Sequence, residues 1–186
     1  MRMRQISEEI LYADEPVVRV GPSIIERLKE IARGNRRRRC RLCAHTDVND
    51  RLHEMLIVHA EGTYVRPHKH LGKPESFHVI EGMVDVILFA EEGRITHVIR
   101  MGDHTSGREF YYRISEPLYH TLLIRSEFLV FHEITSGPFV RSDTLFAPWA
   151  PAEDDPVGQA PFLEGLAQAA ERMRNMAGDT RGEVPR

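Results

Sequence analysis

The chain has 186 residues, of which 41% are hydrophobic and 28% charged, proportions that suit one globular domain with a sizeable core. Its formal net charge of -3 argues against a nucleic-acid-binding protein, which would normally be basic. No apolar run approaches the ~20 residues that span a bilayer, and the N-terminus lacks the apolar part of a secretory signal, so we expect a cytoplasmic protein with no membrane partner.

The first segment, residues 1–37, is expected to form an extension that carries one helix. Apolar residues recur on one helical face over residues 23–33, which predicts a helix there. Ser23 is expected to cap its start, and Gly34 to end it. A short apolar run over residues 17–20 predicts an edge strand.

Residues 38–146 consist of short β-rich runs that alternate with turn residues. Many short strands with close turns, and almost no helices between them, predict an all-β sandwich or closed barrel. The predicted runs are Met55–His59, Thr63–Val65, Phe77–Ile80, Met83–Phe89, Ile95–Ile99, Phe110–Ile114, Leu118–Ile124 and Phe128–Ile134.

The last segment, residues 147–186, is expected to hold a connector, a helix and a tail. Four prolines within residues 147–161 predict an extended connector. A helix is predicted over residues 161–175, because Pro161 suits a first helical turn. The last ten or so residues are expected to be disordered.

Two histidines and a glutamate carry the clearest chemical signal in the chain. His68 and His70 are two residues apart on a predicted strand, so their side chains share one face. The segment Leu71–Pro74 breaks that strand, and Glu75 opens the next one, where it can lie beside both imidazoles. Neutral imidazole and carboxylate are suitable ligands for one divalent ion, such as Fe, Zn, Mn or Ni.

Residues 62–82 resemble the first motif of the cupin superfamily, G-x5-H-x-H-x3,4-E-x6-G, at every fixed position. In that family a second motif, G-x5-P-x-G-x2-H-x3-N, supplies a third histidine ligand. The best candidate here is residues 109–124, where the histidine is retained as His120 but the other four fixed positions differ. The resemblance implies a metal site formed by His68, His70, Glu75 and His120.

Four further segments make the chain similar to the WbuC-type cupins, which are found with bacterial O-antigen genes. These segments are Gly62–His70, Tyr119–Thr121, Gly137–Phe139 and Phe146–Glu153. The resemblance covers roughly residues 36–166 on pattern alone. It implies a cupin double-stranded β-helix (jelly-roll) barrel over residues 38–146, with an N-terminal helical extension, a C-terminal helix and a homodimer. It implies a metalloprotein but no established reaction.

Tyr64 and Arg66 share strand parity with the two histidines and are expected to point into the barrel. Arg66 would then hold a carboxylate or phosphate, or else form an internal Arg–Glu pair, and Tyr64 would transfer a proton. We expect a metal-dependent enzyme acting on a small polar or anionic molecule, such as a sugar derivative, perhaps in surface-polysaccharide biosynthesis. The alternative is a non-catalytic cupin that binds or senses a small ligand.

Two other clusters have less specific interpretations. Cys40 and Cys43 with nearby histidines resemble half of a zinc site, but no second C-x2-C follows, so we expect two free thiols. The run Arg36–Arg39 suits an anion, a solvated face or a subunit contact, and these alternatives stay open. His78 has the opposite parity to Glu75 and is expected to face away from the metal.

Overall fold

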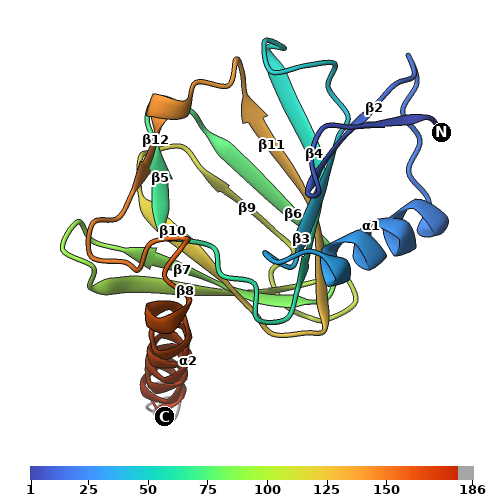
Figure 1. The fold of residues 1–186 in the computed structure, drawn as a ribbon. Coiled ribbons are helices and arrows are strands. Elements are labelled where there is room, and N and C mark those ends of the chain that lie inside the picture. The colour runs from blue at the N-terminus through green and yellow to red at the C-terminus, as the bar shows by residue number, and fades with distance from the viewer. Residues whose placement is uncertain (180–186) are drawn as a thin grey trace, which may run out of the picture.

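Eight strands of the computed structural model, which describes residues 1–179, form a jelly roll of two facing sheets (Figure 1). One sheet contains the order β4-β11-β6-β9 and the other the order β5-β10-β7-β8. The strands are β4 (Leu52–Ala60), β5 (His68–His70), β6 (Glu75–Glu81), β7 (Met83–Phe89), β8 (Ile95–Gly102), β9 (Tyr111–Ile114), β10 (Tyr119–Ile124) and β11 (Phe128–Ser136). This order is that of the double-stranded β-helix, so the expected all-β cupin barrel is confirmed.

All but one of the predicted runs correspond to strands. The exception is Thr63–Val65, which has no regular structure. Inside the barrel, alternate residues of both sheets form one apolar core that includes Phe77, Phe131 and Met101. This core fills the body of the barrel, and the polar cluster described below lies where β5 meets β10.

The N-terminal segment extends one sheet and covers its outer face. Strands β1 (Met3–Gln5), β2 (Ile10–Ala13) and β3 (Arg39–Cys43) continue the sheet beyond β4, and β2 pairs with β3 in parallel. Helix α1 (Pro22–Gly34) packs its apolar face against β3 and β4. The edge strand predicted over residues 17–20 is wrong.

The predicted helix is confirmed, but its N-cap is not the residue that we expected. Gly21 occupies the cap position without a side-chain hydrogen bond, and Pro22 takes the first turn, where its missing N–H costs nothing. At the other end, the Asn35 side chain donates to the carbonyls of Ile31 and Arg39. An amide side chain therefore satisfies a terminal helix carbonyl.

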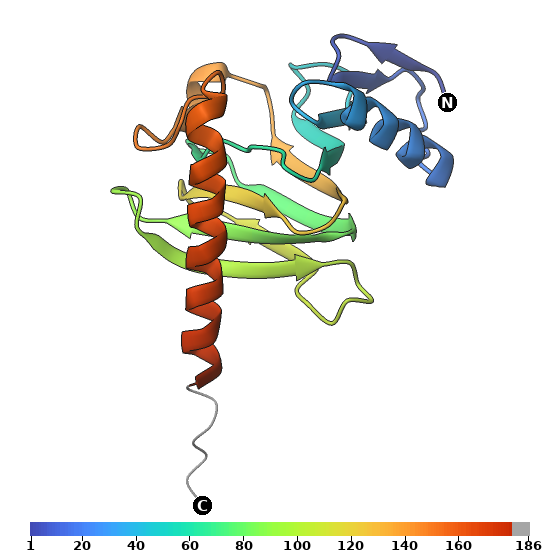
Figure 2. The same ribbon diagram turned by 60° about the horizontal axis from the view of Figure 1, so that its bottom comes forward.

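Helix α2 (Pro156–Asp179) begins earlier than predicted. Asp155 accepts a hydrogen bond from the Gly158 backbone N–H at 3.0 Å and so caps the helix, while Pro161 lies inside it. Figure 2 shows α2 crossing the outer face of the β7–β10 sheet and running past its edge. Its contact there is apolar and includes Leu166. Of the expected tail, residues 177–179 belong to α2 and residues 180–186 lie outside the described residues. No described helix is long and apolar enough to cross a membrane.

Candidate metal centre

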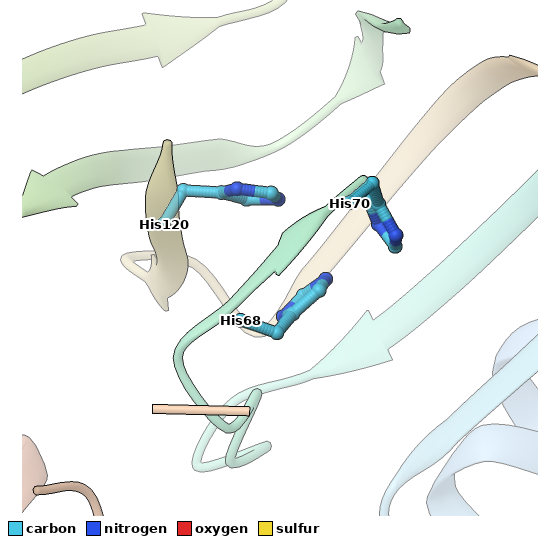
Figure 3. A group of neighbouring side chains, drawn as sticks. All are labelled: His68, His70 and His120. Carbon is cyan, nitrogen blue, oxygen red and sulfur yellow. The ribbon is translucent and has the colours of Figure 1, made fainter. Parts of the chain in front are cut away.

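Three histidines come together where β5 meets β10. His68 and His70 lie on β5, and His120 lies on β10 directly opposite His68 in the antiparallel register. One ring nitrogen of each histidine lies within 4.8 Å of the others, and Figure 3 shows the three rings converging on one space. The jelly roll therefore makes neighbours of two sequence segments that are about fifty residues apart.

Backbone carbonyls orient two of the rings. The Nδ1 of His68 lies 2.8 Å from the Arg66 carbonyl oxygen, and the Nδ1 of His120 lies 3.0 Å from the Leu118 carbonyl oxygen. A carbonyl oxygen only accepts, so each Nδ1 carries the proton. In the neutral form of each ring, Nε2 then carries the free lone pair. This is the tautomer that binds a metal through Nε2.

The third ring is oriented by a strand that the sequence did not reveal. The short strand β12 (Thr144–Phe146) pairs with β5, and the Nδ1 of His70 lies 3.1 Å from the Thr144 hydroxyl oxygen. Thr144 comes 74 residues after His70 in the chain, and no local pattern pointed to it.

Glu75 reaches the histidines from the facing sheet. It is buried as the first residue of β6, with one carboxylate oxygen 3.3 Å from the Nε2 of His70 and the other 3.6 Å from the Nε2 of His120. The buried Tyr112 hydroxyl donates to the carboxylate at 2.9 Å. The structure thus brings the four residues expected from the motif into one cluster, and adds Tyr112 behind the carboxylate.

The protonation states of this cluster suit a cation. Burial lowers the pKa of His68 to about 3, with the neighbouring His120 and His70 acting in the same direction. Burial would raise the pKa of Glu75, but the charge of His120 and hydrogen bonds from His120 and His70 hold that pKa well below its ordinary value. Burial lowers the pKa of His120, but the charge of Glu75, its interaction with the ring and the hydrogen bond to the Leu118 carbonyl together raise it. A divalent ion bound there would replace any proton on the His120 Nε2, because a metal-bound imidazole is neutral.

Tyr64 and Arg66 do not share the face of His68, so that expectation is wrong. Residues 63–67 are irregular, and Val65 packs into the barrel core, which turns its two neighbours outward. The Tyr64 hydroxyl donates to the Pro151 carbonyl at 2.7 Å, and its ring packs edge-on against Phe162 of α2. Its burial raises the pKa of the phenol to about 12. We assign Tyr64 no role at the metal.

Arg66 lies at the rim of the cluster rather than inside it. Its guanidinium lies over the Phe146 ring, 5.0 Å from the centroid, and donates to the Ala147 carbonyl at 3.3 Å. The Phe146 ring in turn lies 6.2 Å from that of His68. The Arg66 Nε is buried without a hydrogen-bond partner, and within residues 1–179 no carboxylate pairs with this guanidinium.

A second interior carboxyl was also missed by the sequence analysis. Glu133 lies on β11 in register with Phe77, on the same face as the core residue Phe131. Burial, and then the negative charge of Glu75, raises the pKa of Glu133 to about 8. Alternation along the strand could have predicted the inward position of Glu133, since residues 129, 131 and 133 share one face.

The other candidates lie away from the cluster. Cys40 and Cys43 are buried free thiols, as expected, and they contribute to two different apolar cores on opposite faces of β3. Burial raises the pKa of Cys40 to about 12, which makes it unreactive. His78 is exposed on β6 and faces away from the histidines, as expected.

Replacing Tyr112 with phenylalanine should weaken metal binding about tenfold, the lower end of the range for residues that support a ligand. The change removes only the hydroxyl that orients the Glu75 carboxylate. Competition with a coloured chelator measures the affinity, and Tyr111→Phe, which alters an exposed neighbour on the same strand, is the control. Equal affinity in both variants would show that the hydroxyl does not support the ligand.

Comparisons with known proteins give one family model and several solved structures. A family model described as a domain of unknown function (DUF6016) matches residues 20–101. No curated protein matches the chain.

Several solved structures are similar to the chain. A protein of Shewanella oneidensis is 12% identical with a TM-score of 0.45, and the match covers 55% of this chain and 66% of that one. Oxalate decarboxylase of Bacillus subtilis is 19% identical with a TM-score of 0.43, over 53% of this chain and 25% of that one. The protein CapF is 20% identical with a TM-score of 0.44, over 57% and 31%. The chain therefore spans about a quarter of the decarboxylase. The assignment of its fold depends on the order of its own strands.

Proposed function

We propose that the protein is a metal-dependent enzyme that binds one divalent ion through His68, His70, His120 and Glu75. The observation that carries this proposal is the convergence of three ring nitrogens, two of which lie within 3.6 Å of one buried carboxylate. Two of the Nδ1 atoms are tied to backbone carbonyls. Three imidazoles and one carboxylate suit Fe, Zn, Mn or Ni. When bound, such an ion acts as a Lewis acid toward a carbonyl or hydroxyl group, or supports O2 chemistry if it is iron.

We propose further that the substrate is a small anionic molecule, such as a carboxylate-bearing sugar derivative. Arg66 at the rim is a half-buried cation whose Nε lacks a partner, and it lies on an aromatic ring that neighbours His68. An unpaired, partly desolvated guanidinium favours an anion, which it can bind through two parallel hydrogen bonds. Phe146 is 42% exposed and offers an apolar contact beside that group.

The protein loaded separately with Fe(II), Mn(II), Zn(II) and Ni(II) tests this function. Each form is incubated with a panel of small hydroxy-, keto- and sugar acids, and consumption is followed by chromatography. Turnover that disappears in His120→Ala supports an enzyme. Saturable binding without turnover under every metal supports the alternative, a non-catalytic ligand-binding or sensing cupin. The absence of both turnover and saturable binding would contradict both functions.

Replacing Arg66 with methionine should leave the metal content intact, because His68 uses only the Arg66 backbone carbonyl. Binding of malonate, a carboxylate probe, should weaken by about 1.5–3 kcal/mol, the contribution of a hydrogen bond to a charged group. Calorimetry on the metal-loaded protein measures this, with Arg113→Met on the outer face of β9 as the control. An unchanged affinity with a large fall in melting temperature would reject the clamp and assign Arg66 to structure.

On the resemblance alone, we also propose that the protein acts as a homodimer in surface-polysaccharide biosynthesis.

A further inference from the structure

A pocket of about 240 Å³ opens outside the metal centre, between the α1–β3 loop and the start of α2. Its wall includes Arg36, Arg37 and Arg38 from the loop, and Glu153 and Gln159 from the other side. Three arginines thus face one carboxylate, which leaves an excess of positive charge in the wall. The sequence analysis left the role of this arginine run open.

The single carboxylate of the wall is already paired. Glu153 accepts from Arg37 at 3.0 Å and lies 3.5 Å from Arg39, while Glu9 lies 3.3 Å from Arg37 and 3.0 Å from Arg39. These contacts form one network that ties the loop to the N-terminal strands and to the connector before α2. Arg37 and Arg39 are therefore structural, and their charges are compensated.

Arg36 and Arg38 have no such compensation. Both side chains are exposed at the pocket, and among residues 1–179 neither forms an ion pair with a carboxylate. An uncompensated pair of guanidinium groups on one concave wall favours a ligand with at least two negative charges.

The backbone holds Arg38 in a conformation that glycine would adopt more easily. Its φ is +55°, in the left-handed region. Its N–H donates to the Asn35 carbonyl, and its carbonyl accepts from the Ala60 N–H and the Thr63 hydroxyl. The loop is therefore fixed by its neighbours, and the strained residue carries a side chain that faces the pocket.

Apart from the paired Glu153, the opposite wall is uncharged and partly apolar. Tyr64 lines it, and because burial raises the pKa of its phenol to about 12, that side chain adds no negative charge. The Gln159 side chain donates to the Ala152 carbonyl and is held in place. The pocket thus combines two free cations with a flat ring, a combination suited to a phosphate group attached to a small organic body.

We propose that this pocket binds a small phosphorylated molecule through Arg36 and Arg38. Phosphate suits the two guanidinium groups better than a single carboxylate does, because it offers two charges and three or more acceptor oxygens. This site is separate from the metal centre and does not depend on the function proposed above.

Inorganic pyrophosphate is the probe, titrated calorimetrically into the metal-free full-length chain in EDTA at low ionic strength. We expect one binding site per chain. The affinity should fall at least about tenfold in Arg36→Ala/Arg38→Ala, since the loss of a single charge-assisted hydrogen bond already accounts for roughly that factor. The matched control is Arg27→Ala/Arg108→Ala, which removes two exposed arginines elsewhere and should leave the affinity within about twofold.

Arg38→Gly separates binding from folding. Glycine suits the left-handed backbone, so the melting temperature should stay equal or rise, while pyrophosphate binding should still weaken. Equal affinity of the wild type and Arg36→Ala/Arg38→Ala, equal weakening in both double variants, or no saturable binding would each overturn the proposal.

Discussion

Replacing His68 and His70 together with alanine is expected to abolish metal binding while the barrel still folds. The change removes two of the three converging ring nitrogens and leaves only His120 and Glu75, too few ligands to retain an ion through purification. Elemental analysis should find about one divalent ion per wild-type chain and none in the variant. Circular dichroism would show that the strands are retained, since both rings lie at the end of the barrel rather than in its core.

A matched control removes two histidines that have no part in the cluster. His78 and His97 are exposed on strands β6 and β8, and His78→Ala/His97→Ala should keep its full metal content. Full occupancy in the His68→Ala/His70→Ala variant would reject the assignment of these residues as ligands.

Replacing Gly82 with alanine is expected to cause the largest loss of stability among the changes considered. Gly82 connects β6 to β7 with a φ of +89°, and an added Cβ would lie 2.1 Å from the Phe128 carbonyl oxygen. The backbone of two neighbouring strands must move to relieve this contact, in addition to the strain of the left-handed conformation. We expect the free energy of unfolding to fall by at least about 3 kcal/mol.

Urea unfolding of the metal-free protein measures this difference without any contribution from the metal. Gly72→Ala is the control, because its φ of +66° is also left-handed but an added Cβ would meet nothing within 4 Å. That variant should lose only about 1 kcal/mol, the cost of the backbone conformation alone. An equal fall in the free energy of unfolding of the two variants would show that the contact with Phe128 does not destabilise the protein.

The barrel and three residues of the cluster could be predicted because both depend on short-range patterns, whereas His120 was identified only through the family resemblance. Strand runs and turns repeat over a few residues, and the spacing of His68, His70 and Glu75 places them at the end of one strand and the start of another. The inward position of Tyr112 could also have been predicted, because Tyr112 is two residues from the core residue Ile114 on β9 and shares its face. The sequence analysis stopped at the motif and did not extend the alternation to the next strand.

The features that were missed depend on distant contacts or on a break in regularity. Strand β12 has three residues and exists only because it pairs with β5, so its own sequence gives little signal. The parity argument for Tyr64 and Arg66 assumed a continuous strand, but β5 begins only at His68, after Pro67. The start of α2 was misplaced because two prolines are available, and the cap of Asp155 selects Pro156.

The orientation of the histidines has a consequence for how this protein can diversify. The acceptors for His68 and His120 are main-chain carbonyls of Arg66 and Leu118, which every amino acid carries. Substitutions at these two positions therefore leave both imidazoles in their ligating form, while they change the charge and shape of the groups that neighbour the ligands. Only His70 depends on a particular side chain, that of Thr144. Under the proposed function, related chains can therefore vary at positions 66 and 118 without losing the metal site, whereas position 144 has far less freedom.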